Sequence, residues 1–222
     1  MEHRRLGKRF ENDWSVDEIR EIQAEIASAV TIPVNVAVEA QHRVLSFERM
    51  EELLRGASLI VLGECGCRSL RRNCDAPLDT CISLNSNAEE SLKSGSGKPK
   101  KVTLEEALEA LRRSHEAGLV HMAYTFKGRE QPEIICSCCS CCCHTLSGLI
   151  RFGLAKHLVV SDTIAETDSS LCTNCGICVE RCQFGAREVV DGRVVHKTEQ
   201  CFGCGLCVTT CPSGAIELVK KS

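Results

Sequence analysis

The apolar positions in the first part of the chain alternate between helical and strand spacing. Isoleucines three and four residues apart follow a capping box at Ser15 and Glu18, in which side chains satisfy free backbone amides at a helix start. Two short apolar runs are typical of buried strands. In chain order, the pattern predicts a helix at 16–29 that ends before Pro33, a strand at 34–38, a helix from Ser46 to a left-handed Gly56, and a strand at 58–62. We therefore expect an α/β module here.

A polar stretch at 85–101, rich in Ser, Gly, Lys and Asn, predicts a flexible linker. A second capping box, Thr103 to Glu106, then begins a helix that runs to about Ala117, and the apolar run 119–126 predicts a strand. A helix followed by a strand also occurs in winged-helix DNA-binding proteins, but no helix–turn–helix pattern precedes this one and it has no strongly basic face. We expect the segment to pack on the first module.

The last third of the chain predicts shorter elements: a helix at 146–155, then a strand at 158–160 or 163–165. The run 189–195 contains Asp191-Gly192, the turn residues of a tight hairpin. The sequence thus predicts an α+β protein. Its expected parts are an α/β module at 1–84, the linker at 85–101, a helix–strand segment at 102–168, and a separate terminal domain at 169–222.

Eighteen cysteines in 222 residues distinguish this chain from an ordinary globular protein. Eight of them form a spacing pattern that occurs twice, and each cysteine of the first copy has a counterpart 29 residues later in the second. The first copy consists of Cys172, Cys175, Cys178 and Cys182, and the second of Cys201, Cys204, Cys207 and Cys211. Gly176 and Gly205 obey the same offset, and we expect both to allow a close approach of backbone to sulfide. The segment is an internal duplication.

Each copy has the spacing C-x2-C-x2-C-x3-C, which binds [4Fe–4S] clusters in bacterial-type ferredoxins, the fourth cysteine serving the other cluster. The spacing predicts one cluster on Cys172, Cys175, Cys178 and Cys211, and another on Cys201, Cys204, Cys207 and Cys182. Zinc sites usually separate their cysteine pairs by longer insertions, and disulfides would imply secretion, so both alternatives fit less well. Pro212 follows Cys211 as in that pattern, whereas Gln183 replaces proline after Cys182.

On these motifs the terminal segment resembles the two-[4Fe–4S] ferredoxins. The resemblance implies a βαββαβ fold with pseudo-twofold symmetry and the transfer of one electron per cluster. We therefore expect residues 169–222 to act as an electron-transfer domain.

Ten further cysteines lie upstream in two groups, and all are candidate metal ligands. The first group follows the strand at 58–62 directly and comprises Cys65, Cys67, Cys74 and Cys81. The second comprises Cys136, Cys138, Cys139, Cys141, Cys142 and Cys143. Adjacent side chains diverge, so residues two or three apart are expected to act together, such as Cys136, Cys138 and Cys141, or Cys139 and Cys142. If the two groups meet in the fold, they supply ligands for one additional iron–sulfur cluster and for two at most.

Several polar residues accompany these cysteines. Arg68, Arg71 and Arg72 can offset the charge of thiolates or donate hydrogen bonds to sulfur, which raises the potential of a cluster. The alternative is a set of structural free cysteines beside a solvated basic loop. His144 either completes a metal site or acts as a hydrogen-bonding group at a helix start.

The upstream motifs resemble those of cysteine-rich iron–sulfur proteins from anaerobes that carry a carboxy-terminal ferredoxin domain. The resemblance extends over about 46–219 and rests on Glu64-Cys-Gly-Cys-Arg68, on 73–81, on His115-Glu-Ala-Gly-Leu-Val-His121, and on 135–143. It implies iron–sulfur redox work and no specific reaction, so no catalytic residue is predicted.

Together these patterns predict an iron–sulfur electron-transfer protein with two [4Fe–4S] clusters and at least one more upstream. It would be a component of an oxidoreductase system rather than a stand-alone enzyme, with a redox protein as electron donor or acceptor. The alternatives are a reductase whose upstream cluster or dithiol is the substrate site, and a redox or metal sensor. No glycine-rich nucleotide loop and no Ser/His/Asp arrangement is visible.

Charge and hydropathy narrow the range of partners. A formal net charge of −3 gives no reason to expect nucleic acid or an anionic membrane as a partner. The chain contains no apolar run of about eighteen residues that would predict a membrane span. The charged amino terminus lacks the apolar stretch of a signal peptide, and with the cysteine content this predicts a cytoplasmic protein in a reducing, anaerobic cell.

Overall fold

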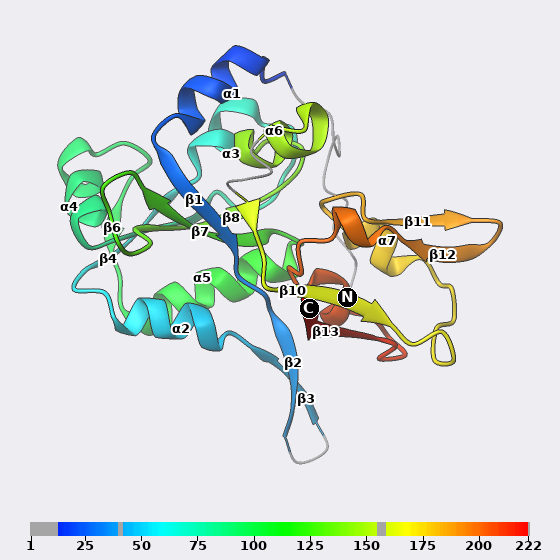
Figure 1. The fold of residues 1–222 in the computed structure, drawn as a ribbon. Helices are drawn as coiled ribbons and strands as arrows, with labels where there is room; N and C mark the ends of the chain where they lie inside the picture. The colour runs from blue at the N-terminus through cyan, green and yellow to red at the C-terminus, as the bar shows by residue number, and fades with distance from the viewer. Residues whose placement is uncertain (1–12, 40–41, 155–158, 222) are drawn as a thin grey trace.

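The computed structural model describes residues 13–39, 42–154 and 159–221, and its largest element is a seven-stranded sheet (Figure 1). The strands follow the order β6-β4-β5-β8-β7-β1-β9. All neighbours are antiparallel except β1 and β9, which are parallel. The strands are β1 (Ile26–Thr31), β4 (Ile60–Glu64), β5 (Asp79–Leu84), β6 (Lys100–Lys101), β7 (Val120–Phe126), β8 (Ile134–Cys138) and β9 (Val159–Val160).

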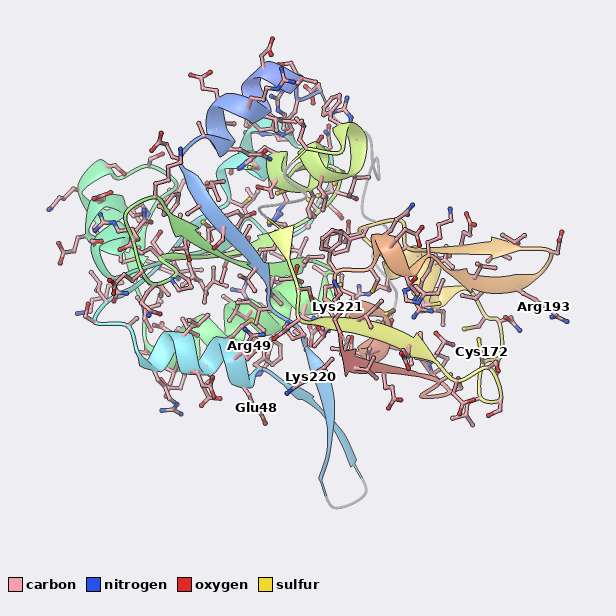
Figure 2. All side chains as sticks on the ribbon, viewed as in Figure 1. Glu48, Arg49, Cys172, Arg193, Lys220 and Lys221 are labelled. Atoms are coloured by element: carbon pink, nitrogen blue, oxygen red, sulfur yellow. The ribbon has the colours of Figure 1, made fainter. Side chains whose placement is uncertain are left out.

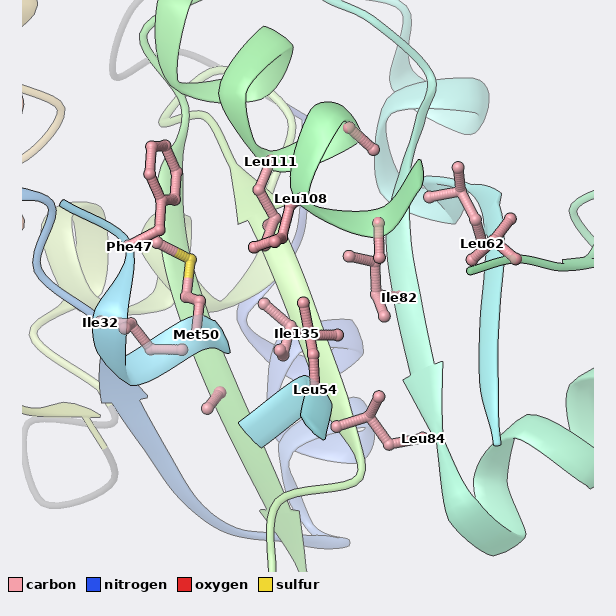
Figure 3. Close-up of a cluster of buried hydrophobic side chains, with 14 of the residues drawn as sticks. Ile32, Phe47, Met50, Leu54, Leu62, Ile82, Leu84, Leu108, Leu111 and Ile135 are labelled. Carbon is pink, nitrogen blue, oxygen red and sulfur yellow. The ribbon is translucent and has the colours of Figure 1, made fainter. Parts of the chain in front are cut away.

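Helices pack on both faces of this sheet. On one face lie α2 (Glu48–Arg55) and α5 (Leu104–Glu116), and on the other α1 (Val16–Gln23), α3 (Gly66–Arg71) and α6 (His144–Phe152) (Figure 1). Met50 and Leu54 of α2 and Leu111 of α5 are almost completely buried over Ile82 and Ile135 of the sheet (Figure 3). The helix–strand segment therefore shares one sheet and one core with the first module.

The two capping boxes are present at Ser15 and Thr103, and each begins a helix as predicted. The end of the first helix was predicted wrongly, because α1 ends at Gln23 and the residues from Ile26 onward form β1. This apolar run pairs with β7, so long-range pairing outweighs the local helical spacing. Gly56 has a φ of −75°, not the left-handed conformation expected of it.

The segment 85–101 is not the coil that its composition predicts. It contains α4 (Asn85–Ser94) and the edge strand β6, with Gly95 at a φ of 66° ending the helix. Ala88 anchors α4 with no exposed surface, and Lys98 Nζ lies 2.6 Å from Glu64 Oε1 on β4. The small polar residues therefore form tight turns between two ordered elements.

The C-terminal unit follows the order β10, α7, β11, β12, α8, β13. Strand β10 (Thr163–Thr167) pairs with β13 (Ile216–Lys220), and β11 (Arg187–Val190) pairs with β12 (Arg193–His196). The predicted hairpin turn is present, with positive φ angles of 48° at Asp191 and 75° at Gly192. The short helices are α7 (Ile177–Arg181), α8 (Leu206–Thr210) and the 3-10 helix η1 (Thr198–Gln200). A separate hairpin consists of β2 (Asn35–Glu39) and β3 (His42–Ser46).

The C-terminal unit is joined to the large sheet by a common apolar core. Leu146 of α6 belongs to the same buried cluster as Phe184, Ala186 and Leu206. The backbone amide of Val34 also donates to the carbonyl of Cys204 at 3.3 Å. Within the described residues, no helix has the length and apolarity that crossing a membrane requires.

Candidate metal centres

Two small cavities in the C-terminal unit are each lined by four cysteines. The first is lined by Cys172, Cys175, Cys178 and Cys211, and the second by Cys182, Cys201, Cys204 and Cys207. Each cavity thus takes three cysteines from one copy of the repeat and the fourth from the other copy. These are the sets that the spacing predicts.

The two cavities have matching backbones. Helices α7 and α8 both begin after a glycine, Gly176 or Gly205, with φ and ψ angles of 80° and −7°. A side chain in this left-handed conformation would be strained, which explains glycine at both positions. At Gly205 a Cβ would also overlap the carbonyl of Val34, whereas at Gly176 it would meet only Val189 Cγ2, at an ordinary contact distance of 4.0 Å. Gly205 therefore also serves the contact between the two units.

Arg187 lines both cavities and is only 4% exposed. Its Nη1 donates to Thr167 Oγ1 at 2.9 Å, but its Nη2 has no hydrogen-bond partner among the described residues. Burial acts to lower the pKa of this guanidinium, and the nearby thiols of Cys207 and Cys178 raise it overall. A buried cation with a free donor between two sets of four thiols fits an anionic cofactor with sulfur acceptors in each cavity.

The first cavity lies toward the outside of the molecule, and the second lies against the large sheet. Cys175 is exposed, and Cys172 lies in the part of the C-terminal unit far from the seven-stranded sheet (Figure 2). The second cavity is lined by Phe184, Phe202 and Leu206, which belong to the core shared with α6. The two sites therefore differ in their access to solvent.

The ten upstream cysteines converge on one edge of the large sheet. Strands β4 and β8 are both antiparallel to β5, so they run in the same direction and their carboxyl ends lie at the same edge. Cys65 and Cys67 follow β4, and the cysteine run follows from the end of β8. The two groups therefore meet, and their side chains divide into two sets.

The first set is a compact quartet of Cys74, Cys139, Cys141 and Cys142, whose sulfur atoms all lie within 4.8 Å of one another. The Sγ of Cys74 lies 3.8 Å from that of Cys139 and 4.0 Å from that of Cys142, and the Sγ atoms of Cys141 and Cys142 are 3.8 Å apart. The three residues from the run have no exposed surface. We call this set the Cys74 quartet.

The surroundings of the Cys74 quartet hold its loops in place. Asn73 Nδ2 donates to the carbonyl of Cys141, and Trp14 Nε1 to the carbonyl of Cys142, each at 2.8 Å. Arg68 is 1% exposed, and its Nη1 lies 3.7 Å from the Sγ of Cys139. The guanidinium of Arg68 therefore lies against the quartet.

The second set, which we call the six-thiol group, contains Cys65, Cys67, Cys81, Cys136, Cys138 and Cys143. Its members are linked pairwise. The Cys143 thiol raises the pKa of Cys67 to about 12, and the Cys138 thiol raises the pKa of Cys143. The Cys138 and Cys81 thiols raise the pKa of Cys136. Side chains alternate along β8, so Cys136 and Cys138 lie on the same face of the strand, whereas Cys139 belongs to the turn that follows its end.

The other predicted polar residues have different environments. Arg71 forms ion pairs with Asp13 and Glu18 and lies 3.8 Å from the ring centre of Trp14, and Arg72 is exposed. Of the three arginines, only Arg68 has a described contact with sulfur. The Nδ1 of His144 lies 3.1 Å from the Sγ of Cys67, and burial lowers the pKa of His144 to about 4. A neutral His144 at the start of α6 thus borders the six-thiol group.

Gln183, which stands where the repeat pattern has proline, connects the two units. It has no exposed surface, and its Oε1 accepts hydrogen bonds from the Ser140 amide at 3.0 Å and from Ser140 Oγ at 2.8 Å. Its Nε2 donates to the carbonyl of Gly118 at 2.9 Å. Gln183, which departs from the repeat pattern, therefore links the C-terminal unit to the cysteine run. Sequence spacing alone does not reveal this contact.

Residues 171–216 match the model of the 4Fe-4S dicluster domain. No curated protein matches the chain. The match supports an iron–sulfur domain of the ferredoxin type at the C-terminus, and the Cys74 quartet adds a cysteine cluster suited to metal upstream of it.

Proposed function

We propose that this chain is an iron–sulfur electron-transfer protein whose C-terminal unit, from β10 to β13, binds two [4Fe–4S] clusters. The observation that carries the proposal is the pair of four-cysteine cavities in which each copy of the repeat contributes one cysteine to the other's site. Clusters of this kind, when bound, accept and donate single electrons. The protein would serve an oxidoreductase system as a carrier and not as a stand-alone enzyme.

The order of strands and helices in the C-terminal unit supports a ferredoxin-like βαββαβ fold. The backbone also repeats in the two halves, since Gly176 and Gly205 have the same φ and ψ angles. The Ala186 amide donates to Cys182 Sγ at 3.3 Å, and the Ala215 amide is a hydrogen-bond partner of Cys211 that favours its thiolate. Both crossed cysteines therefore have a backbone donor at the same position of the repeat.

The exposed loop around the first cavity is the proposed docking site for a redox partner protein. Leu171 and Cys175 are exposed, and Cys172 is half-buried at the outer part of the unit (Figure 2). The second cavity faces the large sheet instead, beside Phe184. A partner that approaches the loop would come close to the first site, while the second lies toward the upstream cysteines.

We extend the proposal to the six-thiol group, which offers enough ligands for a third cluster. Cys67, Cys138 and Cys143 are linked through neighbouring thiols, and Cys65 adjoins Cys67. Cys65 follows β4 and Cys67 lies in α3, while Cys138 ends β8 and Cys143 precedes α6, so the four suit a site between these two segments. The function as a carrier does not depend on this third site.

The proposal predicts the metal content of protein purified without oxygen. The two C-terminal sites require about eight iron and about eight sulfide per chain, and the third site raises both to about twelve. Iron and sulfide analysis measures these totals, and EPR spectroscopy of the reduced protein should show interacting cluster signals. Full-length protein that binds zinc in place of iron at the repeat cysteines would contradict the proposal.

Replacing Arg187 with methionine is expected to lower the reduction potential of the C-terminal clusters. The guanidinium lines both cavities and stabilises the more negative, reduced state. Loss of about 1.4 kcal/mol of this stabilisation corresponds to about 60 mV for a one-electron couple. An EPR-monitored redox titration measures the shift, and Arg193→Met on the exposed hairpin is the matched control (Figure 2). Equal shifts in the two variants would rule out a specific role for Arg187.

A further inference from the structure

We propose that Cys74, Cys139, Cys141 and Cys142 bind a single tetrahedral metal ion through four thiolates, and that this site does not hold a further iron–sulfur cluster. These four residues lie outside the two C-terminal cavities, so this proposal does not depend on whether those cavities bind clusters. It also divides the ten upstream cysteines between two kinds of metal site.

The spacing of the sulfur atoms carries this inference. In a regular tetrahedron two ligands are about 1.6 times as far apart as the metal is from each, so a metal–sulfur bond of about 2.3 Å places the sulfurs about 3.8 Å apart. Two of the sulfur–sulfur distances in the Cys74 quartet are 3.8 Å, a third is 4.0 Å, and the other pairs lie within 4.8 Å. The three closest pairs therefore have the spacing that one ion at the centre of the four sulfurs requires.

A cubane cluster requires a wider arrangement. Each of its four thiolates binds a different iron, so the thiolates surround a core of several atoms and lie farther apart. The cysteines of the two C-terminal cavities are less closely packed than the quartet. Across the described part of the chain, no three of their sulfurs lie within 4.8 Å of one another, and the Cys74 quartet is the set that does.

The charge around the quartet supports bound thiolates. A divalent ion with four thiolates carries two negative charges, and Arg68 provides a buried positive charge beside Cys139. The other partners of Arg68 are the carbonyls of Pro77 and Ser137 and the hydroxyl of Thr80, and no described carboxylate pairs with it. A buried guanidinium without a carboxylate needs another anion, and the metal–thiolate group supplies one.

Four protein thiolates leave no open position on the ion, which is typical of structural zinc sites. Ferrous iron has the same coordination chemistry, and the test separates the two metals. Any thiol that is protonated before the ion binds releases its proton to solvent. The bound ion would tie Cys74 to the turn at 139–142 and so fix Ser140, which donates to Gln183. The site would thus order the loop that joins the two units.

The test uses the full chain, purified without oxygen and analysed for zinc, iron and sulfide. We expect one zinc per chain, and X-ray absorption at the zinc edge should give four sulfur neighbours at about 2.3 Å and no neighbouring metal. One iron in excess of sulfide, in place of zinc, also supports a single-ion site. Extra iron matched by sulfide at these cysteines, or protein with neither zinc nor excess iron, would overturn the proposal.

Variants assign the ion to its ligands. Cys74→Ser and Cys142→Ser should each lose the single ion, whereas Cys81→Ser, which lies outside the quartet, should retain it. Cys175→Ser should lose cluster iron and sulfide and keep the ion, which separates this inference from the proposed function. If the quartet variants fail to fold, the zinc-edge spectrum of the unaltered protein decides the matter. Retention of the ion in both quartet variants would contradict the assignment.

Discussion

Alanine at both Cys172 and Cys182 is expected to remove both C-terminal clusters, whereas alanine at both Cys172 and Cys211 is expected to remove only one. Cys172 and Cys211 line the same cavity, and Cys182 lines the other. The first double variant therefore damages both sites and the second damages one. Compared with the unaltered protein, we expect losses of about eight and about four iron atoms per chain, with matching losses of sulfide.

This comparison discriminates between two ways of assigning the same eight cysteines. If each run of four cysteines held its own cluster, the pair Cys172 and Cys182 would belong to one site and the pair Cys172 and Cys211 to two. The order of the losses would then be reversed. Both variants remove two cysteines from one unit, so general destabilisation affects them similarly. Alanine is preferred to serine because it leaves no oxygen that could replace the thiolate.

Iron and sulfide analysis after anaerobic reconstitution provides the measurement, and the equivalent pairs in the second copy provide the control. Alanine at both Cys182 and Cys201 should remove one cluster, and alanine at both Cys201 and Cys211 should remove both. Equal losses in all four double variants would indicate that the unit collapses whenever any site is damaged. Circular dichroism would then show unfolded protein, and single variants with EPR would be needed to assign the ligands. The reversed order would contradict crossed ligation.

The grouping of the eight C-terminal cysteines around two cavities was predictable because local structure positions most of them. Within each copy, two cysteines precede a short helix and the third lies in its first turn, and the glycine before α7 or α8 has the required left-handed conformation. The spacing therefore determines which three sulfurs meet. The internal duplication then relates the two halves, so that the fourth cysteine of each copy reaches the other cavity.

The division of the upstream cysteines was not predictable, because it depends on long-range pairing. Cys74 joins sulfurs that lie 65 and 68 residues away in the chain, and only the parallel directions of β4 and β8 bring them together. The side chains of the run then separate according to the alternation of β8 and the turn that follows it. Residue spacing predicted that Cys139 acts with Cys142, which holds, but the predicted set of Cys136, Cys138 and Cys141 was wrong. Cys141 instead lies beside its neighbour Cys142, because the turn after β8 brings the two sulfurs to 3.8 Å.

The environments of the upstream polar residues were equally hidden. Arg68, Arg71 and Arg72 look alike in the sequence, but only Arg68 points to sulfur, since Arg71 pairs with Glu18 of α1 and Arg72 is exposed. The segment 85–101 was mistaken for a linker because small polar residues are common both in coils and in the tight turns around a short helix. Tertiary packing decides between these outcomes, and composition does not.

Arg68→Met is expected to lower the thermal stability of the protein strongly. The arginine donates to Pro77 O at 2.9 Å, to Thr80 Oγ1 at 2.8 Å and to Ser137 O at 3.3 Å, and it lies against Cys139. Methionine fills a similar volume but leaves these acceptors without a partner and the thiolates without a counter-charge. Breaking a buried charge pair in this way costs about 3–5 kcal/mol. For a chain of this size, that corresponds to a melting temperature lower by roughly 6–20 °C.

Anaerobic calorimetry measures the change, and Arg49→Met is the matched control. Arg49 Nη1 lies 3.0 Å from Asp162 Oδ2, but the two side chains are 49% and 63% exposed. Solvent screens such a pair, so its loss should cost less than about 1 kcal/mol. Arg68→Lys is expected to lie between the two, because lysine keeps the charge but cannot reproduce the planar set of donors.

The metal content separates a structural role of Arg68 from a role in charge compensation. A residue that supports the ligands of a metal site typically changes metal affinity by about 10–100-fold when it is replaced. Competition with a chelator should therefore remove the single ion from Arg68→Met at lower chelator concentration than from Arg68→Lys. If Arg68→Met unfolds at a lower temperature yet keeps the ion as tightly as the unaltered protein, the guanidinium serves only its hydrogen bonds. The negative charge of the quartet would then have to be balanced by other groups.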